Sequence, residues 1–204
     1  MPLPLAEFMA LATTCAPNVS PATLAAIVQV ESGFNALAIG VNGTPRVTVT
    51  ATTAADAAAR AKALIAAGRS VDLGLAQINS KNLAWLGLSV EDAFDPCRNL
   101  AAGARVLQTG YAPASDGPAD QQAALRVAIS RYNTGDARRG FANGYVGKVA
   151  RAAGAVVPAL ETEPKPAAIA APPPPQTAAW DVFAQAQAGD FLIRVTTTIE
   201  GAAP

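Results

Sequence analysis

The prolines of this 204-residue chain are concentrated near its C-terminal end. Seven of the 16 prolines lie between Pro158 and Pro175, with alanines among them, and the run ends in four consecutive prolines. Such a segment cannot form a packed core, and polyproline II conformation stiffens it into a spacer. We therefore expect a folded domain at 1–157, a Pro/Ala-rich linker at 158–179 and a short tail at 180–204.

The tail at 180–204 is too short to bury a core of its own. Its segment FLIRVTTTI is rich in β-branched residues and is typical of a strand. A strand without a partner can add to the sheet of another protein. The tail is therefore a candidate binding segment for a partner protein.

The segment before the prolines has the apolar periodicity of a mainly α domain. Two helix starts carry capping-box spacing with Asp in place of Glu, at Thr53 with Asp56 and at Ser89 with Asp92. One short segment at 46–50 alternates instead and predicts a strand or half of a small β-hairpin inserted in the helical domain. The expected helices are 4–15, 21–32, 54–67, 79–86, 89–94, 99–110, 119–133 and 143–154.

Charge and residue content exclude several classes of function. Lys plus Arg and Asp plus Glu number 15 each, so no net charge attracts the chain to nucleic acid or to an anionic membrane. The chain has no histidine, which excludes Ser-His and Cys-His nucleophile pairs and most catalytic zinc sites. We expect no metal or organic cofactor, and acid–base chemistry must fall mainly to carboxylates, Tyr or Lys.

The two cysteines, Cys15 and Cys97, are far apart in sequence and form no CxxC pair. They are either two small buried thiols or one disulfide, which an oxidising compartment would permit. The N-terminus has no basic segment and its apolar stretch is interrupted by Glu7, so it is not a clear signal peptide. No apolar run approaches the length of a membrane span.

Glu31 stands where an apolar helix face ends. Leu24, Ile27 and Val28 form the i, i+3, i+4 stripe of a core-facing helix, and the next position on that stripe is Glu31. The helix then breaks at Ser32-Gly33. A glutamate at a helix end that only touches the core is the simpler interpretation. The alternative is a partly desolvated carboxyl that keeps its proton near neutral pH and can act as an acid.

Two further stretches carry uncharged hydrogen-bonding groups. DLGLAQIN, residues 72–79, contains Gln77 and Asn79, and SRYNTG, residues 130–135, contains Tyr132 and Asn133 before a glycine. Amide and hydroxyl side chains suit a neutral ligand rich in hydroxyl and amide groups, such as a sugar polymer.

Together, ESGFN, GLAQIN and YNTG resemble, in order, the motifs of the lytic transglycosylases of the soluble-lytic and goose-lysozyme-like group. The resemblance covers about residues 5 to 155. The position of Cys15, the DxGLxQIN form, the stretch FDPCRNLAAGA and the proline-rich tail are similar to the peptidoglycan-cleaving subunit of type IV secretion systems. The resemblance implies a lysozyme-like, mainly α domain and a periplasmic protein that opens the cell wall for such an apparatus.

The resemblance also implies roles for individual residues. Glu31 would act as acid and then as base, while the 6-hydroxyl of muramic acid closes a 1,6-anhydro ring without a second carboxylate. Independently of the resemblance, we expect Asp72 to brace its loop by accepting hydrogen bonds from backbone N–H groups, as Asp commonly does at turns. Two alternatives stay open: a goose-type hydrolase in which Asp72 directs a water, and a wall-binding assembly protein without activity. The residues expected to contact the glycan are Ser32, Gln77, Asn79, Tyr132, Asn133 and Tyr145.

Overall fold

The computed structural model describes residues 2–43, 48–112 and 117–162. They belong to one compact unit, Met1–Glu163. The predicted tail at 180–204 lies outside the described residues, as does the predicted linker apart from residues 158–162. Those five residues continue the last helix, so that helix extends past the expected domain boundary at 157.

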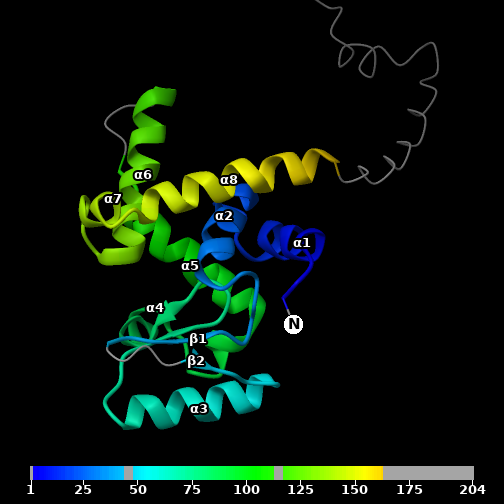
Figure 1. Ribbon diagram of the computed structural model, residues 1–204, viewed down its shortest axis with the longest axis vertical. Coiled ribbons are helices and arrows are strands. Elements are labelled where there is room, and N and C mark those ends of the chain that lie inside the picture. The colour runs from blue at the N-terminus through cyan, green and yellow to red at the C-terminus, as the bar shows by residue number, and fades with distance from the viewer. Residues whose placement is uncertain (1, 44–47, 113–116, 163–204) are drawn as a thin grey trace, which may run out of the picture. The chain divides into compact units, whose positions relative to one another are not determined.

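The described residues form a mainly α domain, which confirms the predicted fold class (Figure 1). The helices expected at 4–15, 21–32, 54–67, 99–110 and 119–133 all form, with ends that differ by a few residues. The α-helices are α1 (Leu5–Cys15), α2 (Pro21–Glu31), α3 (Ala54–Ala66), α4 (Leu83–Leu86), α5 (Pro96–Gly110), α6 (Pro118–Thr134), α7 (Arg139–Ala142) and α8 (Tyr145–Thr162).

The prediction of a helix at 79–86 is mostly wrong. Ile78–Asn79 is a strand, Ser80–Asn82 is a 3₁₀ turn, and only Leu83–Leu86 is α-helical. Asn79 causes the difference, because it pairs with Asp72 across the sheet while its side-chain oxygen accepts a 3.0 Å bond from the Lys81 amide. Such a side-chain cap competes with continuous helix.

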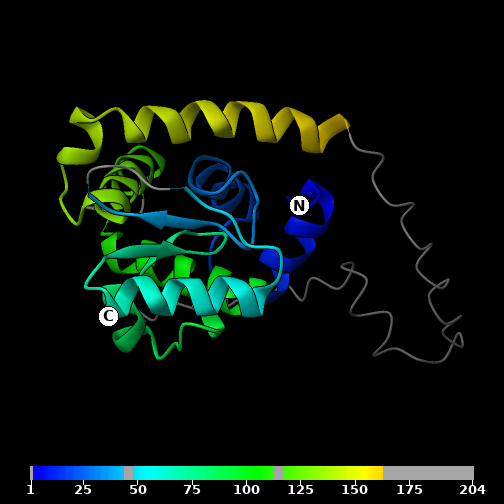
Figure 2. The same ribbon diagram turned by 60° about the horizontal axis from the view of Figure 1, so that its bottom comes forward.

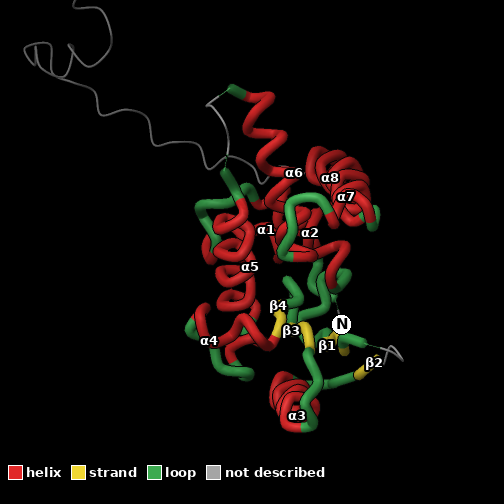
Figure 3. Tube along the Cα trace, turned by 90° about the vertical axis from the view of Figure 1, so that its left-hand side faces the viewer, coloured by secondary structure: helices red, strands yellow, loops and turns green. Residues whose placement is uncertain are grey.

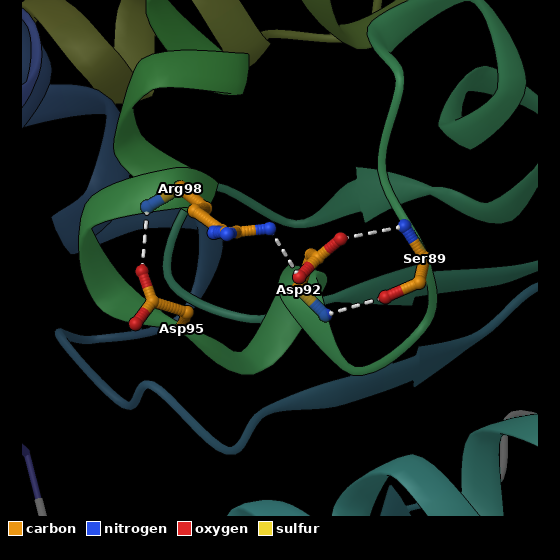
Figure 4. A network of polar contacts seen from close by, with 4 residues as sticks. All are labelled: Ser89, Asp92, Asp95 and Arg98. Atoms are coloured by element: carbon orange, nitrogen blue, oxygen red, sulfur yellow. Dashed lines mark hydrogen bonds and ion pairs between the residues drawn. The ribbon is translucent and has the colours of Figure 1, made fainter.

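The helix expected at 89–94 is also wrong, since only a 3₁₀ turn forms at Asp92–Phe94. The predicted capping pair is nevertheless present: the Ser89 amide donates to Asp92, and the Asp92 amide donates to the Ser89 hydroxyl (Figure 4). Asp92 also accepts from the Arg98 guanidinium at 2.6 Å, and Asp95 caps the Arg98 amide. These bonds turn the chain directly into α5.

The predicted hairpin forms, since β1 (Ile39–Val41) and β2 (Thr48–Val49) pair antiparallel, and it is part of a four-stranded antiparallel sheet. The order of the sheet is β2, β1, β3 (Val71–Leu73) and β4 (Ile78–Asn79). The predicted strand at 46–50 contains β2, and residues 46–47 lie outside the described ranges. Figure 2 shows α3 against the strands on the side away from α8. Strands of two or three residues are too short to show alternation, so the sequence could not reveal the other three.

Helix α2 lies at the centre of the domain, between α8 and α5 in Figure 1. Leu24 and Val28 pack into the main core with α1, the sheet and α5, whereas Ala26 and Ile27 pack into a second cluster with α6 and α8. A helix that is apolar on most sides is a buried helix. The core therefore fixes α2, and with it Glu31 at its end, from two directions.

A disulfide joins Cys15 at the end of α1 to Cys97 in the first turn of α5, with 5.3 Å between the Cα atoms.

The tube view in Figure 3 shows most helices on one side and the strands with α3 on the other. Within the ranges that the structure describes, no helix combines the length and apolar character needed to cross a membrane.

Candidate active site

Glu31 is partly buried at the C-terminal end of α2, and its carboxylate accepts a hydrogen bond from the Tyr145 hydroxyl on α8. Burial raises the pKa of Glu31 from 4.5 to about 7, because it removes water from the charged form. The Tyr145 hydrogen bond lowers this pKa, and the negative charge of Asp72 raises it further. Glu31 can therefore exchange a proton near neutral pH.

Two cavities of about 350 and 500 Å³ meet at Glu31. The first extends along β3 and β4 toward α5, and the second extends toward the start of α8. Polar and charged side chains dominate both cavities, as expected for a site that binds a sugar polymer. Five residues line both cavities: Glu31, Asn42, Asp72, Gln77 and Asn133.

Gln77 occupies a tight turn between β3 and β4, with a φ of 48°. Its side-chain nitrogen donates to the Gly74 carbonyl at 2.9 Å and to the Ala38 carbonyl at 3.2 Å. A Cβ on Gly40 would lie 2.7 Å from the Gln77 side-chain oxygen, so a larger residue there would have to displace the end of the Gln77 side chain. The turn thus holds the Gln77 side chain against the wall of both cavities.

Asn99 on α5 is fully buried and supports this turn through hydrogen bonds. Its side-chain oxygen accepts from the Ala76 amide at 2.7 Å, and its nitrogen donates to the carbonyls of Leu73 and Ala93. This role of Asn99 was not predicted from the sequence. An asparagine on the apolar face of a helix was the available signal, because a buried amide needs partners.

The third motif lies at the end of α6. The Tyr132 hydroxyl donates to the Ala76 carbonyl at 2.6 Å, so Tyr132 lines the first cavity and also fixes the β3–β4 turn. Asn133 accepts a 2.9 Å bond from the Asn143 side chain and lines both cavities. The third motif thus contacts the β3–β4 turn, which belongs to the second motif, although the two are far apart in sequence.

Asp72 has both carboxylate oxygens engaged by amides. Asn79 donates to one oxygen at 2.6 Å, and Asn42 donates to the other at 2.9 Å. The expected bracing of the loop through backbone amides is not what the structure shows, since the partners are side chains. Asn42 lines both cavities and was missed by sequence reasoning, because nothing in its local sequence marks it.

Ser32 is not among the residues lining either cavity. Its hydroxyl donates to the Leu75 carbonyl at 2.8 Å, which ties the end of α2 to the β3–β4 turn. The other predicted site residues, Gln77, Asn79, Tyr132, Asn133 and Tyr145, line one or both cavities together with Glu31. Among the residues with described positions, no three Cys, Asp or Glu side chains are grouped as a metal site requires.

Comparison with known proteins agrees with this geometry. A family model described as "Transglycosylase SLT domain" matches residues 8–153. Protein virB1 of Agrobacterium fabrum is 47% identical over 164 residues, which cover 80% of this chain and 66% of that protein. The type IV secretion system protein virB1 of Brucella suis biovar 1 is 41% identical over 181 residues, which cover 83% of this chain and 76% of that protein.

The chain thus spans slightly less than two thirds of the Agrobacterium relative. No solved structure gives a significant match. The three motifs around Glu31, the family model over most of the chain and the identity to these relatives agree: the chain belongs to the transglycosylase SLT family and is related to the virB1 proteins.

Proposed function

We propose that the chain is a peptidoglycan lytic transglycosylase in which Glu31 acts first as acid and then as base. Glu31 donates its proton to the glycosidic oxygen that leaves C1 of muramic acid, and the C1–O bond breaks. The 6-hydroxyl of the same sugar then forms a bond to C1 and returns its proton to Glu31. The product ends in 1,6-anhydromuramic acid, and no water is consumed.

One observation carries this proposal: the Glu31 carboxyl, which lines both cavities, is poised to exchange a proton. Its pKa of about 7 matches the range in which one residue can donate and then retrieve a proton. Asp72 is the other carboxylate that lines the cavities, and two amides already engage its oxygens. A mechanism with one carboxylate therefore fits best.

Product analysis tests the mechanism. Purified sacculi would be digested and the muropeptides measured by mass spectrometry, where anhydro ends are lighter by one water than reducing ends. Reducing ends alone would favour goose-type hydrolysis, which Asp72 could support because it lines both cavities with Glu31. Glycan binding without any cleavage would favour a wall-binding assembly protein.

Two isosteric variants extend this test. Glu31→Gln keeps the shape but cannot exchange the proton, so cleavage should fall by about 10⁴-fold or more while glycan binding persists. Asp72→Asn should retain most cleavage in the transglycosylase mechanism and lose it in the hydrolase mechanism. Full activity of Glu31→Gln would rule out both enzymatic mechanisms.

We further propose that the sugar cleft uses Gln77, Asn79, Tyr132, Asn133 and Tyr145. All five line the cavities, and amide and hydroxyl groups suit hydroxyl-rich ligands. The family motif places Ser32 near the cleavage site as well. Its bond to the Leu75 carbonyl supports a role in holding the turn rather than direct contact with sugar.

The cellular role that we propose is local opening of the cell wall, in the periplasm, for a type IV secretion apparatus. Two observations support this role: the Brucella relative is named a type IV secretion system protein, and the disulfide needs an oxidising compartment. The tail at 180–204 is the proposed partner-binding segment. A chain ending at Glu163 should keep glycan cleavage and lose binding to secretion components; loss of cleavage would contradict this division.

A further inference from the structure

Each of the two cavities that meet at Glu31 also contains one lysine. Lys81 lines the first cavity, and Lys148 lines the second. Lys148 lies three residues after Tyr145 on α8, so both side chains share the helix face that borders the cavity. Lys81 lies in the 3₁₀ turn whose start Asn79 caps. Both lysines thus stand on elements that already carry proposed site residues.

Neither ammonium group is needed by the carboxylates of the site. Glu31 accepts from Tyr145, and the two oxygens of Asp72 accept from Asn42 and Asn79. Among the residues that the structure describes, the ion pairs are Arg60–Asp56, Lys62–Glu91 and Arg98–Asp92, so Lys81 and Lys148 belong to none of them. Their positive charges are available to an anion that enters the cavities.

The proposed substrate brings anions to these positions. In peptidoglycan, each muramic acid carries a lactyl arm that ends either in a free carboxylate or in a stem peptide with carboxylates of its own. A β-1,4 glycan of N-acetylglucosamine alone has no such groups. A lysine ammonium is a compact cation that interacts well with a single carboxylate.

We infer that Lys81 and Lys148 bind carboxylates on the muramic acid arms, one in each cavity, and so select anionic peptidoglycan over neutral glycans. The inference rests on the proposed function and names the chemistry by which that site recognises its substrate. The lysines are specificity-determining residues and take no part in the proton transfer at Glu31.

The test compares Lys81→Gln, Lys148→Gln and the double variant with wild type, in the full chain. Lys62→Gln is the matched control, because Lys62 lies on α3 and pairs with Glu91 outside the cavities. Three substrates are needed: native sacculi, sacculi whose carboxyl groups have been converted to amides, and glycan freed of stem peptides by an amidase. The measurement is kcat and KM for release of anhydro ends at low and high salt.

On native sacculi each cavity variant should lower kcat/KM roughly three- to tenfold, mainly through KM, with a smaller loss at high salt. On amidated sacculi the variants should match wild type. On peptide-free glycan, a persistent loss assigns the contact to the lactyl carboxylate, and no loss assigns it to the stem peptide.

Equal losses on native and amidated sacculi, or no loss beyond that of Lys62→Gln, would overturn the inference. These results can be told apart from failure of the proposed function. If wild type releases anhydro ends from native sacculi, the proposed reaction stands even when the lysine variants behave like wild type. If wild type releases none, the reaction itself is wrong.

Discussion

Glu31 is held partly out of water, so its ionisation opposes folding. The pKa rises from 4.5 to about 7 in the folded chain, so the unfolded state loses its proton first as pH rises. The contribution of the protonated Glu31 carboxyl to the free energy of unfolding is therefore fully present below pH 4.5. It is lost as pH rises through 7. Glu31→Gln should raise the free energy of unfolding at pH 8 by up to about 3 kcal/mol and change it little at pH 4.

Urea denaturation of wild type and Glu31→Gln at the two pH values checks this prediction. Glu7→Gln serves as the control, because Glu7 lies on an exposed part of α1. A variant that is less stable than wild type at pH 8 would show that the Glu31 carboxylate is stabilised rather than desolvated.

Tyr145 tunes the same carboxyl through one hydrogen bond. Its hydroxyl favours the charged form of Glu31 and lowers the pKa. Tyr145→Phe should therefore move the alkaline limb of the kcat/KM profile to higher pH, because Glu31 stays protonated longer. Tyr111→Phe, at the exposed end of α5, is the control that should leave the profile unchanged. A shift to lower pH would exclude this role for Tyr145.

At the scale of elements, the position of the β3–β4 turn depends on contacts with α5, α6 and the end of α2. Asn99 is fully buried and makes two hydrogen bonds to the backbone of that turn, at Leu73 and Ala76, and a third to Ala93 in the 3₁₀ turn before α5. Asn99→Ala leaves these buried groups without partners, at about 1–3 kcal/mol each in the worst case. We expect the free energy of unfolding to fall by roughly 3 kcal/mol or more.

Chemical denaturation of Asn99→Ala measures this loss. Asn18→Ala is the matched control, since Asn18 is exposed between α1 and α2 and its removal should change stability by at most about 0.5 kcal/mol. If the two variants lose the same stability, Asn99 does not hold the turn in the way described.

At the scale of the whole domain, the disulfide links its N-terminal helix to the middle of the chain. Cys15 and Cys97 are 82 positions apart in sequence, and closing a loop of this length stabilises the folded state by about 4 kcal/mol in the chain-entropy model. The Cys15→Ser, Cys97→Ser double variant should melt roughly 8–16 °C below the oxidised wild type. Reduced wild type should behave like the variant; equal melting of oxidised and reduced protein would contradict the prediction.

Local patterns along the sequence were sufficient to predict much of the secondary structure of the domain. The apolar stripe of α2 predicted the helix and placed Glu31 at its end, and the pair Thr53–Asp56 predicted a helix cap that forms. The pair Ser89–Asp92 makes its predicted hydrogen bonds, although no α-helix begins there. These features depend on residues within one or two turns of each other. Each can therefore be inferred from spacing alone.

Only the tertiary structure decided which side chains meet in the site and how they change the pKa of Glu31. The partner of Glu31 is Tyr145, 114 residues away, and the partners of Asp72 are Asn42, directly after β1, and Asn79 on β4. The raised pKa of Glu31 depends on how completely α2 is packed between the two clusters of the core. Desolvation and hydrogen bonding act over a few ångströms in space, and residues that meet at this distance need not be close in sequence.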